Sequence, residues 1–185
     1  MRNIQAHSSE GFTLIELMVS IAIISILSAI IFASFTTARK QSRVAERVTD
    51  MKQVQAALEF YYAANRSYPS TGGSGNWRGV CVNWGSYTAN NTIPGLAPLY
   101  IPVVPTDPQT DVANSLSCYL YTSDGKDYAF LDHNVPEMWA NQSAPNYMNY
   151  PELVDPTRDG GSNGSVVDGN APWAWKVYSP GAIGW

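Results

Sequence analysis

The sequence has few side chains of the kinds that perform catalysis or bind transition metals. It contains two cysteines and two histidines in 185 residues, and neither His7 nor His133 stands at a ligand spacing from Cys81 or Cys118. A Cys/His zinc site needs about four such ligands at short spacings, and a hydrolase triad needs a histidine beside a nucleophile and an acid. The composition therefore argues against a Cys/His metal site and predicts that the chain is not an enzyme.

Positive charge is also scarce. The chain has 11 Lys and Arg residues against 15 Asp and Glu residues, which gives a formal net charge of -4. Binding to nucleic-acid phosphates depends on a strong positive field, and this composition does not supply one. Nucleic acid is therefore not expected as the main partner. A length of 185 residues suits one anchored or globular domain and argues against a large multi-domain enzyme.

The N-terminal part contains one long apolar run. Residues 12–35 carry a single charged side chain, Glu16. A helix of this length covers roughly 36 Å at about 1.5 Å per residue, which is enough for a bilayer core of about 30 Å. A cleaved secretory signal is a poorer match, because its apolar part has only about 7–15 residues and ends in a small-residue site. The run therefore predicts one transmembrane helix.

Glu16 is unusual in this run, because an ionised carboxylate in the apolar zone costs about 2.5–3.5 kcal/mol and usually has a partner or a function. It lies four residues after Phe12. Cleavage between Gly11 and Phe12 would create an α-amino group about one helical turn away, on the same or a neighbouring helix, that can pair with this carboxylate. The alternative is a solvated Glu16 at the level of the lipid headgroups.

The residues Gly11-Phe12-Thr13-Leu14-Ile15-Glu16-Leu17-Met18-Val19 resemble the prepilin cleavage and methylation motif of type IV pilins and type II secretion pseudopilins. The resemblance implies that a prepilin peptidase cuts after Gly11 on the cytoplasmic side and methylates the new amino group of Phe12. It also implies that Glu16 pairs with the Phe12 amine of a neighbouring subunit during assembly. Residues 1–11 are then a leader peptide, and residues 12–35 are the transmembrane and filament-core helix.

The apolar run continues into an amphipathic segment, residues 36–64, in which apolar side chains recur at steps of three and four. No Pro or Gly interrupts residues 12–64, so the sequence predicts one continuous helix. Its charged side contacts either neighbouring subunits or solvent, and the sequence does not distinguish these. The residues on that side are Arg39, Arg43, Glu46, Arg47, Asp50 and Lys52.

Pro and clustered Gly in residues 68–75 end the helix. Residues 65–135 are expected to form a loop followed by an antiparallel hairpin of residues 117–122 and 127–132, joined by a turn that contains Asp124-Gly125. This hairpin resembles the head sheet of pilins. The fold class is therefore expected to be α+β and type IV pilin-like, with a long helix on a small antiparallel sheet. Residues 136–185 are expected to be a loop-rich aromatic region.

Two further sites are expected in the soluble part. Cys81 and Cys118 are predicted to form a disulfide if this part is exported, with about 3–4 kcal/mol of stabilisation in the chain-entropy model; paired buried thiols are the alternative. Asp155, Asp159 and Asp168 supply oxygen ligands that suit calcium, and the resemblance implies calcium binding in a C-terminal loop of secretion pseudopilins. Asp residues are also common in turns, which accounts for their presence here without a metal. We therefore predict that the chain binds no cofactor, and calcium binding is the alternative.

The resemblance predicts a structural subunit of a type IV pilus-like filament. Its expected partners are copies of itself, a prepilin peptidase and the assembly machinery of the inner membrane. The chain would be a single-pass bacterial inner-membrane protein before assembly and part of an extracellular pilus afterwards. The first alternative is a pseudopilin of a type II secretion system, located in a periplasmic pseudopilus. The second is a single-pass anchored binding protein that uses its Trp- and Tyr-rich head to hold a ligand.

Overall fold

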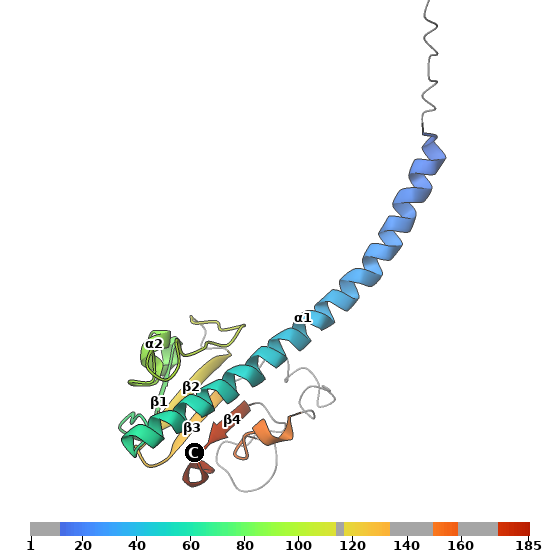
Figure 1. Ribbon diagram of the computed structural model, residues 1–185. Helices are drawn as coiled ribbons and strands as arrows, with labels where there is room; N and C mark the ends of the chain where they lie inside the picture. Colours follow the sequence, from blue (N-terminus) through green and yellow to red (C-terminus); the bar gives the residue numbers. More distant parts are fainter. Residues whose placement is uncertain (1–11, 114–116, 134–149, 159–173) are drawn as a thin grey trace, which may run out of the picture. The chain divides into compact units, whose positions relative to one another are not determined.

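The computed structural model describes residues 12–113, 117–133, 150–158 and 174–185, without the side chains of residues 30–34. The chain divides into two compact units, Met1–Lys40 and Gln41–Trp185. Helix α1 (Leu14–Asn65) supplies residues to both units (Figure 1). The prediction of one long helix is confirmed, with bounds that differ from the expected ones by two residues at the start and one at the end. Arg66 follows the helix with a positive φ of 58°, and helical hydrogen bonding stops there.

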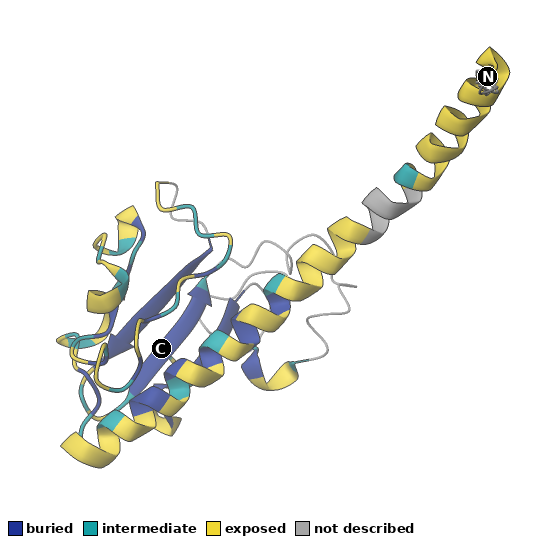
Figure 2. Cartoon of the chain, turned by 45° about the horizontal axis from the view of Figure 1, so that its top comes forward, coloured by how far each residue is buried: buried dark blue, intermediate teal, exposed yellow. Residues whose placement is uncertain are grey.

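The first unit contains the apolar part of α1. Almost every described side chain of residues 12–29 is exposed, and only Ser28 is half-buried (Figure 2). The exposed side chains include Phe12 at 88% and Leu17 at 60%. Within the described residues, no helix combines the length and the apolar character needed to cross a membrane.

In the second unit, α1 buries one stripe of apolar side chains. Buried residues recur at three- and four-residue steps, which is the pattern of a helix that packs one face on a core. They are Val44, Val48, Met51, Val54, Ala57 and Leu58. The repeat of three and four residues was expected from the sequence. Near the end of the helix, Tyr61 is half-buried and Tyr62 is exposed.

The core under this stripe is a four-stranded antiparallel sheet of β1 (Gly73–Gly79), β2 (Cys118–Ser123), β3 (Tyr128–His133) and β4 (Ala174–Tyr178), in the order β1-β2-β3-β4. The predicted hairpin is β2 and β3, displaced by one residue. Its turn is held by the Asp124 carboxylate, which accepts hydrogen bonds from the amides of Lys126 and Asp127. Gly125 adopts a φ of 93° there, which glycine permits without strain.

The two edge strands differ from the sequence expectations. β1 is rich in glycine, was expected to be loop, and has a register irregularity between Gly73 and Arg78. β4 lies inside the region expected to be loop-rich. Its five residues are too few for a period-two pattern to stand out, and its middle residue is Lys176, which is fully buried. Charged side chains rarely mark a buried strand unless a partner neutralises them.

Both faces of the central strands are buried, as Figure 2 shows. One face packs on α1 through side chains such as Tyr121, Phe130 and Trp175. The opposite face carries a second apolar cluster, formed by Cys81, Cys118, Leu120, Leu131 and Ala174. Short elements complete the second unit: η1 (Val82–Trp84), α2 (Ala89–Thr92), η2 (Pro151–Leu153) and η3 (Pro180–Ala182).

Candidate processing and assembly site

The start of α1 is closed by a reciprocal pair of side chains, Thr13 and Glu16. Thr13 precedes the first helical residue and Glu16 is the third residue of the helix. The Thr13 amide and hydroxyl both donate to Glu16 Oε2, at 2.9 and 2.6 Å, and the Glu16 amide donates to Thr13 Oγ1 at 3.3 Å. This is a capping box, which satisfies amides that the helix itself leaves unbonded. The capping box was not expected from the sequence, although Thr-x-x-Glu before an apolar run is its signature.

The capping box gives Glu16 a role within its own chain and leaves it able to bind a second donor. All of its side-chain hydrogen bonds within the described residues go to Oε2. Oε1 is therefore available to a cation from outside the chain, since a carboxylate accepts several hydrogen bonds. Phe12 is highly exposed and lies one turn away, whereas Gly11 lies outside the described residues. The carboxylate and the first residue after the expected cleavage point are thus neighbours.

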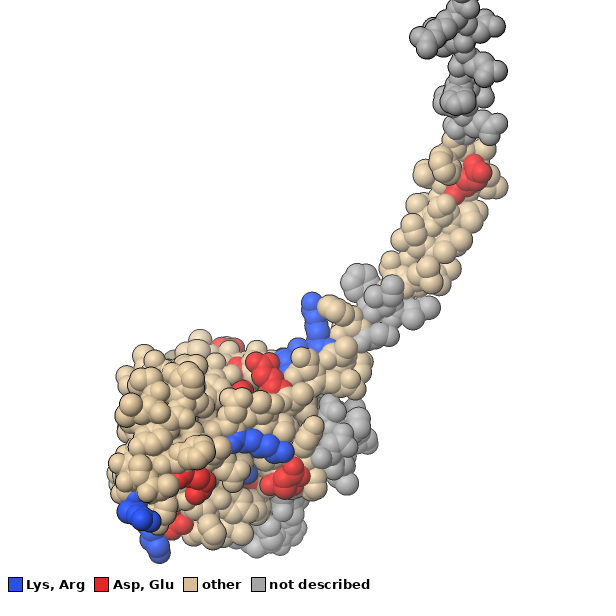
Figure 3. All heavy atoms as spheres, in the orientation of Figure 1, with Lys and Arg blue, Asp and Glu red and all other residues tan. Residues whose placement is uncertain are grey.

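The helix surface beyond this box is apolar and carries no charge among residues 17–29. Figure 3 shows this surface as neutral apart from one acidic side chain near its start. Apolar residues are exposed all around the helix and do not form a single stripe; they include Ile15, Ile21, Ile24 and Ile26. A helix that is apolar on every side is stable only when other apolar groups surround it. Within the first unit, no described residue provides that cover.

The second unit holds a buried ion network around Arg47. Its Nε lies 2.5 Å from Asp107 Oδ2 and 3.6 Å from Asp132 Oδ2, and all three side chains are fully buried. Its Nη2 also donates to Asp107 Oδ1 and to Gln109, each at 3.2 Å. The sequence placed Arg47 on the exposed charged side of the helix, which is wrong. The two aspartates come from distant parts of the chain and neutralise it inside the core.

Asp50 lies at the margin of this network and is half-buried. Its Oδ2 accepts a hydrogen bond of 3.0 Å from the Tyr119 hydroxyl. Burial raises the pKa of Asp50 to about 6, with further upward contributions from the charges of Glu46 and Asp107, while the Tyr119 hydrogen bond opposes the shift. The charge of Arg47 also opposes the upward shift of this pKa.

Cys81 and Cys118 are joined by a disulfide with a Cα–Cα distance of 6.4 Å. Cys118 is the first residue of β2, and Cys81 lies just before η1. Both side chains are fully buried in the second apolar cluster. The bridge therefore ties the loop after β1 to the central part of the sheet.

Asp155, one of the three residues expected to bind calcium, belongs to a second buried ion network. One of its oxygens pairs with Arg158, and the other lies 2.8 Å from Lys176 Nζ. Lys176 also donates to the main-chain oxygens of Ile183 and Trp185. The structure therefore uses the Asp155 oxygens to neutralise two cations. Asp159 and Asp168 lie outside the described residues, and no group of acidic, Cys or His side chains in the described part forms a metal cluster.

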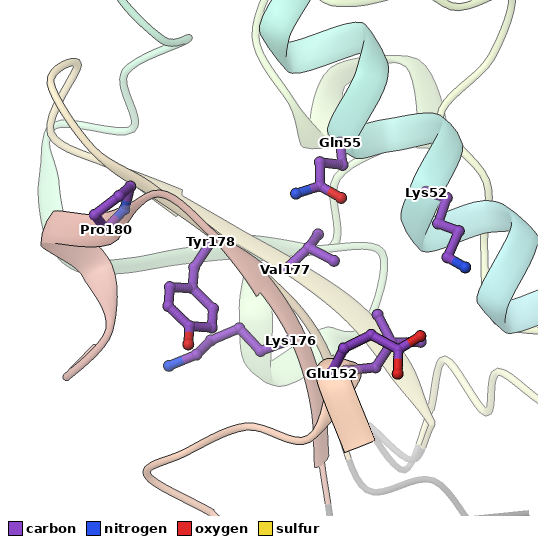
Figure 4. A pocket seen from close by; sticks show the side chains of 8 residues that line it. Lys52, Gln55, Glu152, Lys176, Val177, Tyr178 and Pro180 are labelled. Carbon is purple, nitrogen blue, oxygen red and sulfur yellow. The ribbon is translucent and has the colours of Figure 1, made fainter. Parts of the chain in front are cut away.

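A hollow of about 380 Å³ lies between α1, η2 and β4. Figure 4 shows Gln55 and Val177 pointing toward one another across it, with Lys52 above Glu152 and with Lys176 and Tyr178 on the other side of β4. Its lining contains no Cys, His or Ser.

Comparison with known proteins gives matches to the N-terminal motif and to a secretion protein. The family described as the prokaryotic N-terminal methylation motif matches residues 7–32, a range that contains Gly11, Phe12 and Glu16. The type II secretion system core protein G of Pseudomonas aeruginosa is 39% identical over 67 residues, which are 36% of this chain and 47% of that protein.

Two proteins with the same name are similar over a comparable stretch. The one from Pectobacterium carotovorum subsp. carotovorum is 31% identical over 65 residues, which are 35% of this chain and 42% of that protein. The one from Escherichia coli (strain K12) is 33% identical over 61 residues, which are 33% and 42% of the two chains. The matched part thus spans less than half the length of these relatives. No solved structure matches the chain significantly.

Proposed function

The chain belongs to the family of type IV pilins and type II secretion pseudopilins, and on this basis we propose that it is a structural subunit of a secretion-type pseudopilus. The observation that carries this proposal is the similarity to relatives named as type II secretion system core protein G. The sequence alone favoured a subunit of an extracellular pilus, whereas these relatives favour the first alternative, a pseudopilin of a type II secretion system. The chain is not an enzyme, in keeping with relatives named as core proteins of a secretion system.

The capped start of α1 supports a specific route of assembly. Cleavage after Gly11 frees the amine of Phe12, and this cation pairs with Glu16 Oε1 of a neighbouring copy while Thr13 holds Oε2. Apolar side chains of the first unit then cover those of other copies, which removes them from water or lipid. Before assembly the same apolar residues, 12–35, anchor the subunit in the inner membrane. After assembly the second unit lies in the periplasm.

Glu16→Ala and Glu16→Gln test this route in cells that carry the secretion machinery. Both variants are expected to insert in the membrane and to be cleaved, but to enter assembled filaments at least about tenfold less than the parent chain, because the Phe12 amine loses its carboxylate partner. Intact mass spectrometry of the membrane and filament fractions measures processing, N-methylation of Phe12 and incorporation together. The control is Ser20→Ala, one turn away, which is expected to assemble normally.

Three outcomes of the same measurement would contradict the proposal. Equal incorporation of Glu16→Ala and the parent chain would remove the pairing mechanism. A chain that still starts at Met1 in every fraction would remove processing, and would favour the anchored binding protein. A processed, methylated chain that is sheared from the outside of intact cells would establish the extracellular pilus in place of the periplasmic pseudopilus.

A further inference from the structure

The first unit ends in two adjacent cations, Arg39 and Lys40. Both side chains are exposed, and between Glu16 and Lys40 the sequence contains no other charged residue. Within the described residues neither of the two cations forms an ion pair. The end of the first unit therefore presents positive charge that no neighbouring carboxylate of the unit balances.

The cation of Arg39 adjoins apolar surface. Its Cζ lies 4.2 Å from the centre of the Phe35 ring, which is within the range of a cation–π contact. Phe35 is the last residue of the apolar run and is 50% exposed. A long cationic side chain beside an exposed ring suits the border of a bilayer, because its stem covers apolar surface while its charge stays among headgroups and water.

The length of the helical stretch fits two headgroup regions at once. Arg39 lies 27 residues after Phe12, which is about 40 Å at a rise of about 1.5 Å per residue. A bilayer measures about 40–45 Å when its headgroup regions are included. When Phe12 and Glu16 lie in one headgroup region, Arg39 and Lys40 therefore lie in the other.

The proposed route of assembly assigns the two cations to the periplasmic side. Cleavage after Gly11 takes place on the cytoplasmic side, so the other end of the anchored stretch faces the periplasm. Lys and Arg are usually concentrated at the cytoplasmic ends of membrane helices, so orientation does not account for Arg39 and Lys40. An anion at the periplasmic surface of the membrane does account for them.

We propose that Arg39 and Lys40 bind the phosphate groups of anionic phospholipids in the periplasmic leaflet of the inner membrane. The guanidinium of Arg39 is suited to two parallel hydrogen bonds with phosphate oxygens. Adjacent helical residues point in different directions, so each cation binds its own headgroup. The ligand is a lipid because its acyl chains also cover the exposed apolar surface that ends at Phe35, which a soluble anion leaves bare. This inference rests on the proposed function, because it requires a membrane-anchored subunit.

Lipid selectivity of the full-length chain tests the binding. The chain is released from nanodiscs of equimolar phosphatidylglycerol and phosphatidylcholine, and native mass spectrometry measures the lipids that remain bound. The parent chain is expected to retain at least about fivefold more phosphatidylglycerol than phosphatidylcholine, because one cation at an anionic surface contributes roughly this factor. In Arg39→Gln/Lys40→Gln the preference is expected to fall below about twofold.

Two further variants control for charge and for position. Arg39→Lys/Lys40→Arg retains both charges and is expected to retain the preference. Lys52→Gln/Lys126→Gln removes two exposed cations from the second unit and is also expected to retain it. Resistance of Cys81 and Cys118 to thiol labelling shows that each variant has folded. Equal binding of the two lipids by the parent chain, or an unchanged preference in Arg39→Gln/Lys40→Gln, would overturn the proposal.

Fluorescence quenching tests the depth of the cations. Ala38 is exposed next to Arg39, and Ser25 lies halfway between Phe12 and Ala38. A fluorophore on Ala38→Cys in vesicles of the same lipids is expected to be quenched at least about threefold more by lipids with a headgroup nitroxide than by lipids with a nitroxide in the middle of the acyl chain. The reverse is expected for Ser25→Cys. Stronger mid-chain quenching at Ala38→Cys would place the cations in the hydrocarbon and overturn the proposal.

The outcomes separate this inference from the proposed function. If the parent chain binds the two lipids equally while Glu16→Ala still fails to enter filaments, the lipid site is wrong and the proposed function stands. If Arg39→Gln/Lys40→Gln keeps its lipid preference but does not assemble, the cations contact neighbouring subunits, and the lipid site is again wrong. If neither nitroxide quenches either fluorophore, the chain is not anchored in the bilayer, and the proposed function and this inference fail together.

Discussion

The two described stretches of α1 have the same backbone structure and opposite side-chain environments. Residues 14–29 are almost entirely apolar, yet within the chain nearly all of them are exposed. Residues 41–65 are more polar, yet they bury a complete stripe against the sheet, including Met51, Val54 and Leu58 at 0% exposure. Hydrophobicity alone therefore does not predict burial within this chain.

The difference shows where each stretch obtains its stability. The second stretch finds its packing partners in its own chain, so its side chains determine whether the second unit folds. The first stretch finds none among the described residues, so its side chains act through other molecules. Substitutions in the two stretches are expected to separate folding from assembly, and the following experiments use that separation.

The largest expected loss of folding stability comes from Arg47→Ala. Removal of the guanidinium leaves Asp107 and Asp132 buried without their cation, and breaking a buried ion pair in this way costs about 3–5 kcal/mol. Urea denaturation of the full chain in detergent micelles measures the free energy of unfolding. Lys52→Ala, at an exposed position of the same helix, is the control and is expected to change it by no more than about 0.5 kcal/mol. Similar free energies of unfolding for Arg47→Ala and Lys52→Ala would mean that the Arg47 ion network does not stabilise the fold.

Matched leucine truncations compare the two stretches directly. Leu58→Ala is expected to lower the free energy of unfolding by about 2–5 kcal/mol, because it opens a cavity in the core. Leu17→Ala removes the same atoms from a side chain that is 60% exposed, and is expected to leave the second unit's stability unchanged while weakening assembly. The same denaturation experiment and the filament fraction give the two readouts. The comparison is wrong if Leu17→Ala destabilises the second unit as much as Leu58→Ala does.

The disulfide provides the next largest effect. Replacement of both Cys81 and Cys118 by Ala is expected to lower the free energy of unfolding by about 3 kcal/mol, because the bridge closes a long loop in the unfolded chain. The native chain is expected to resist thiol-reactive reagents until a reductant is added. Labelling of both residues in the native chain without reductant would show that no bridge forms.

The sequence predicted the features that local patterns encode. The long helix follows from the absence of Pro and Gly, and the β2–β3 hairpin from alternating side chains around Asp124-Gly125. The cleavage motif was recognised from consecutive residues. The pairing of Cys81 with Cys118 required no choice, because the chain has only two cysteines.

The features that the sequence did not predict depend on contacts between distant residues. The sequence predicts an exposed Arg47, because it does not show that Asp107 and Asp132 lie beside it. Likewise, Lys176 is unexpected in a buried strand, because its ion pair with Asp155 is not visible in the sequence. Asp155, one of the residues predicted to bind calcium, takes part in this contact. Strand β1 was missed because its glycines satisfy turn rules equally well.

Thr13→Ala tests the start of the first stretch of α1, and its expected effect on stability is smaller. Loss of the capping box is expected to destabilise the first turn of α1 by about 1 kcal/mol. Hydrogen exchange at the amides of that turn measures this change, while the unfolding midpoint of the second unit is expected to remain the same. Thr13→Ser retains the hydroxyl and is expected to preserve protection. Identical exchange in Thr13→Ala and the parent chain would mean that the box does not hold the helix start.

The smallest expected effect is a pH dependence within the second stretch. Because the pKa of Asp50 is raised from 3.8 in a model carboxyl group to about 6 in the fold, the folded state binds a proton more tightly than the unfolded state. The carboxylate therefore lowers the free energy of unfolding above about pH 6, and this loss is relieved as the pH falls from about 6 to 4. Asp50 is half-exposed, so the effect is expected to be about 1 kcal/mol or less.

Asp50→Asn resembles the protonated side chain and still accepts from Tyr119, so it is expected to be more stable than the parent chain at pH 7 and equal to it near pH 4. Asp124→Asn is the matched opposite. The amides of Asp127 and Lys126 lower the pKa of Asp124, so its ionised form stabilises the fold above the model value of 3.8, and this contribution is lost as the pH falls. Denaturation of both variants at pH 7 and pH 4 measures these effects. At pH 7, the free energy of unfolding is expected to be higher than that of the parent chain in Asp50→Asn and lower in Asp124→Asn. A change of the same sign in both variants at pH 7 would show that burial does not raise the pKa of Asp50.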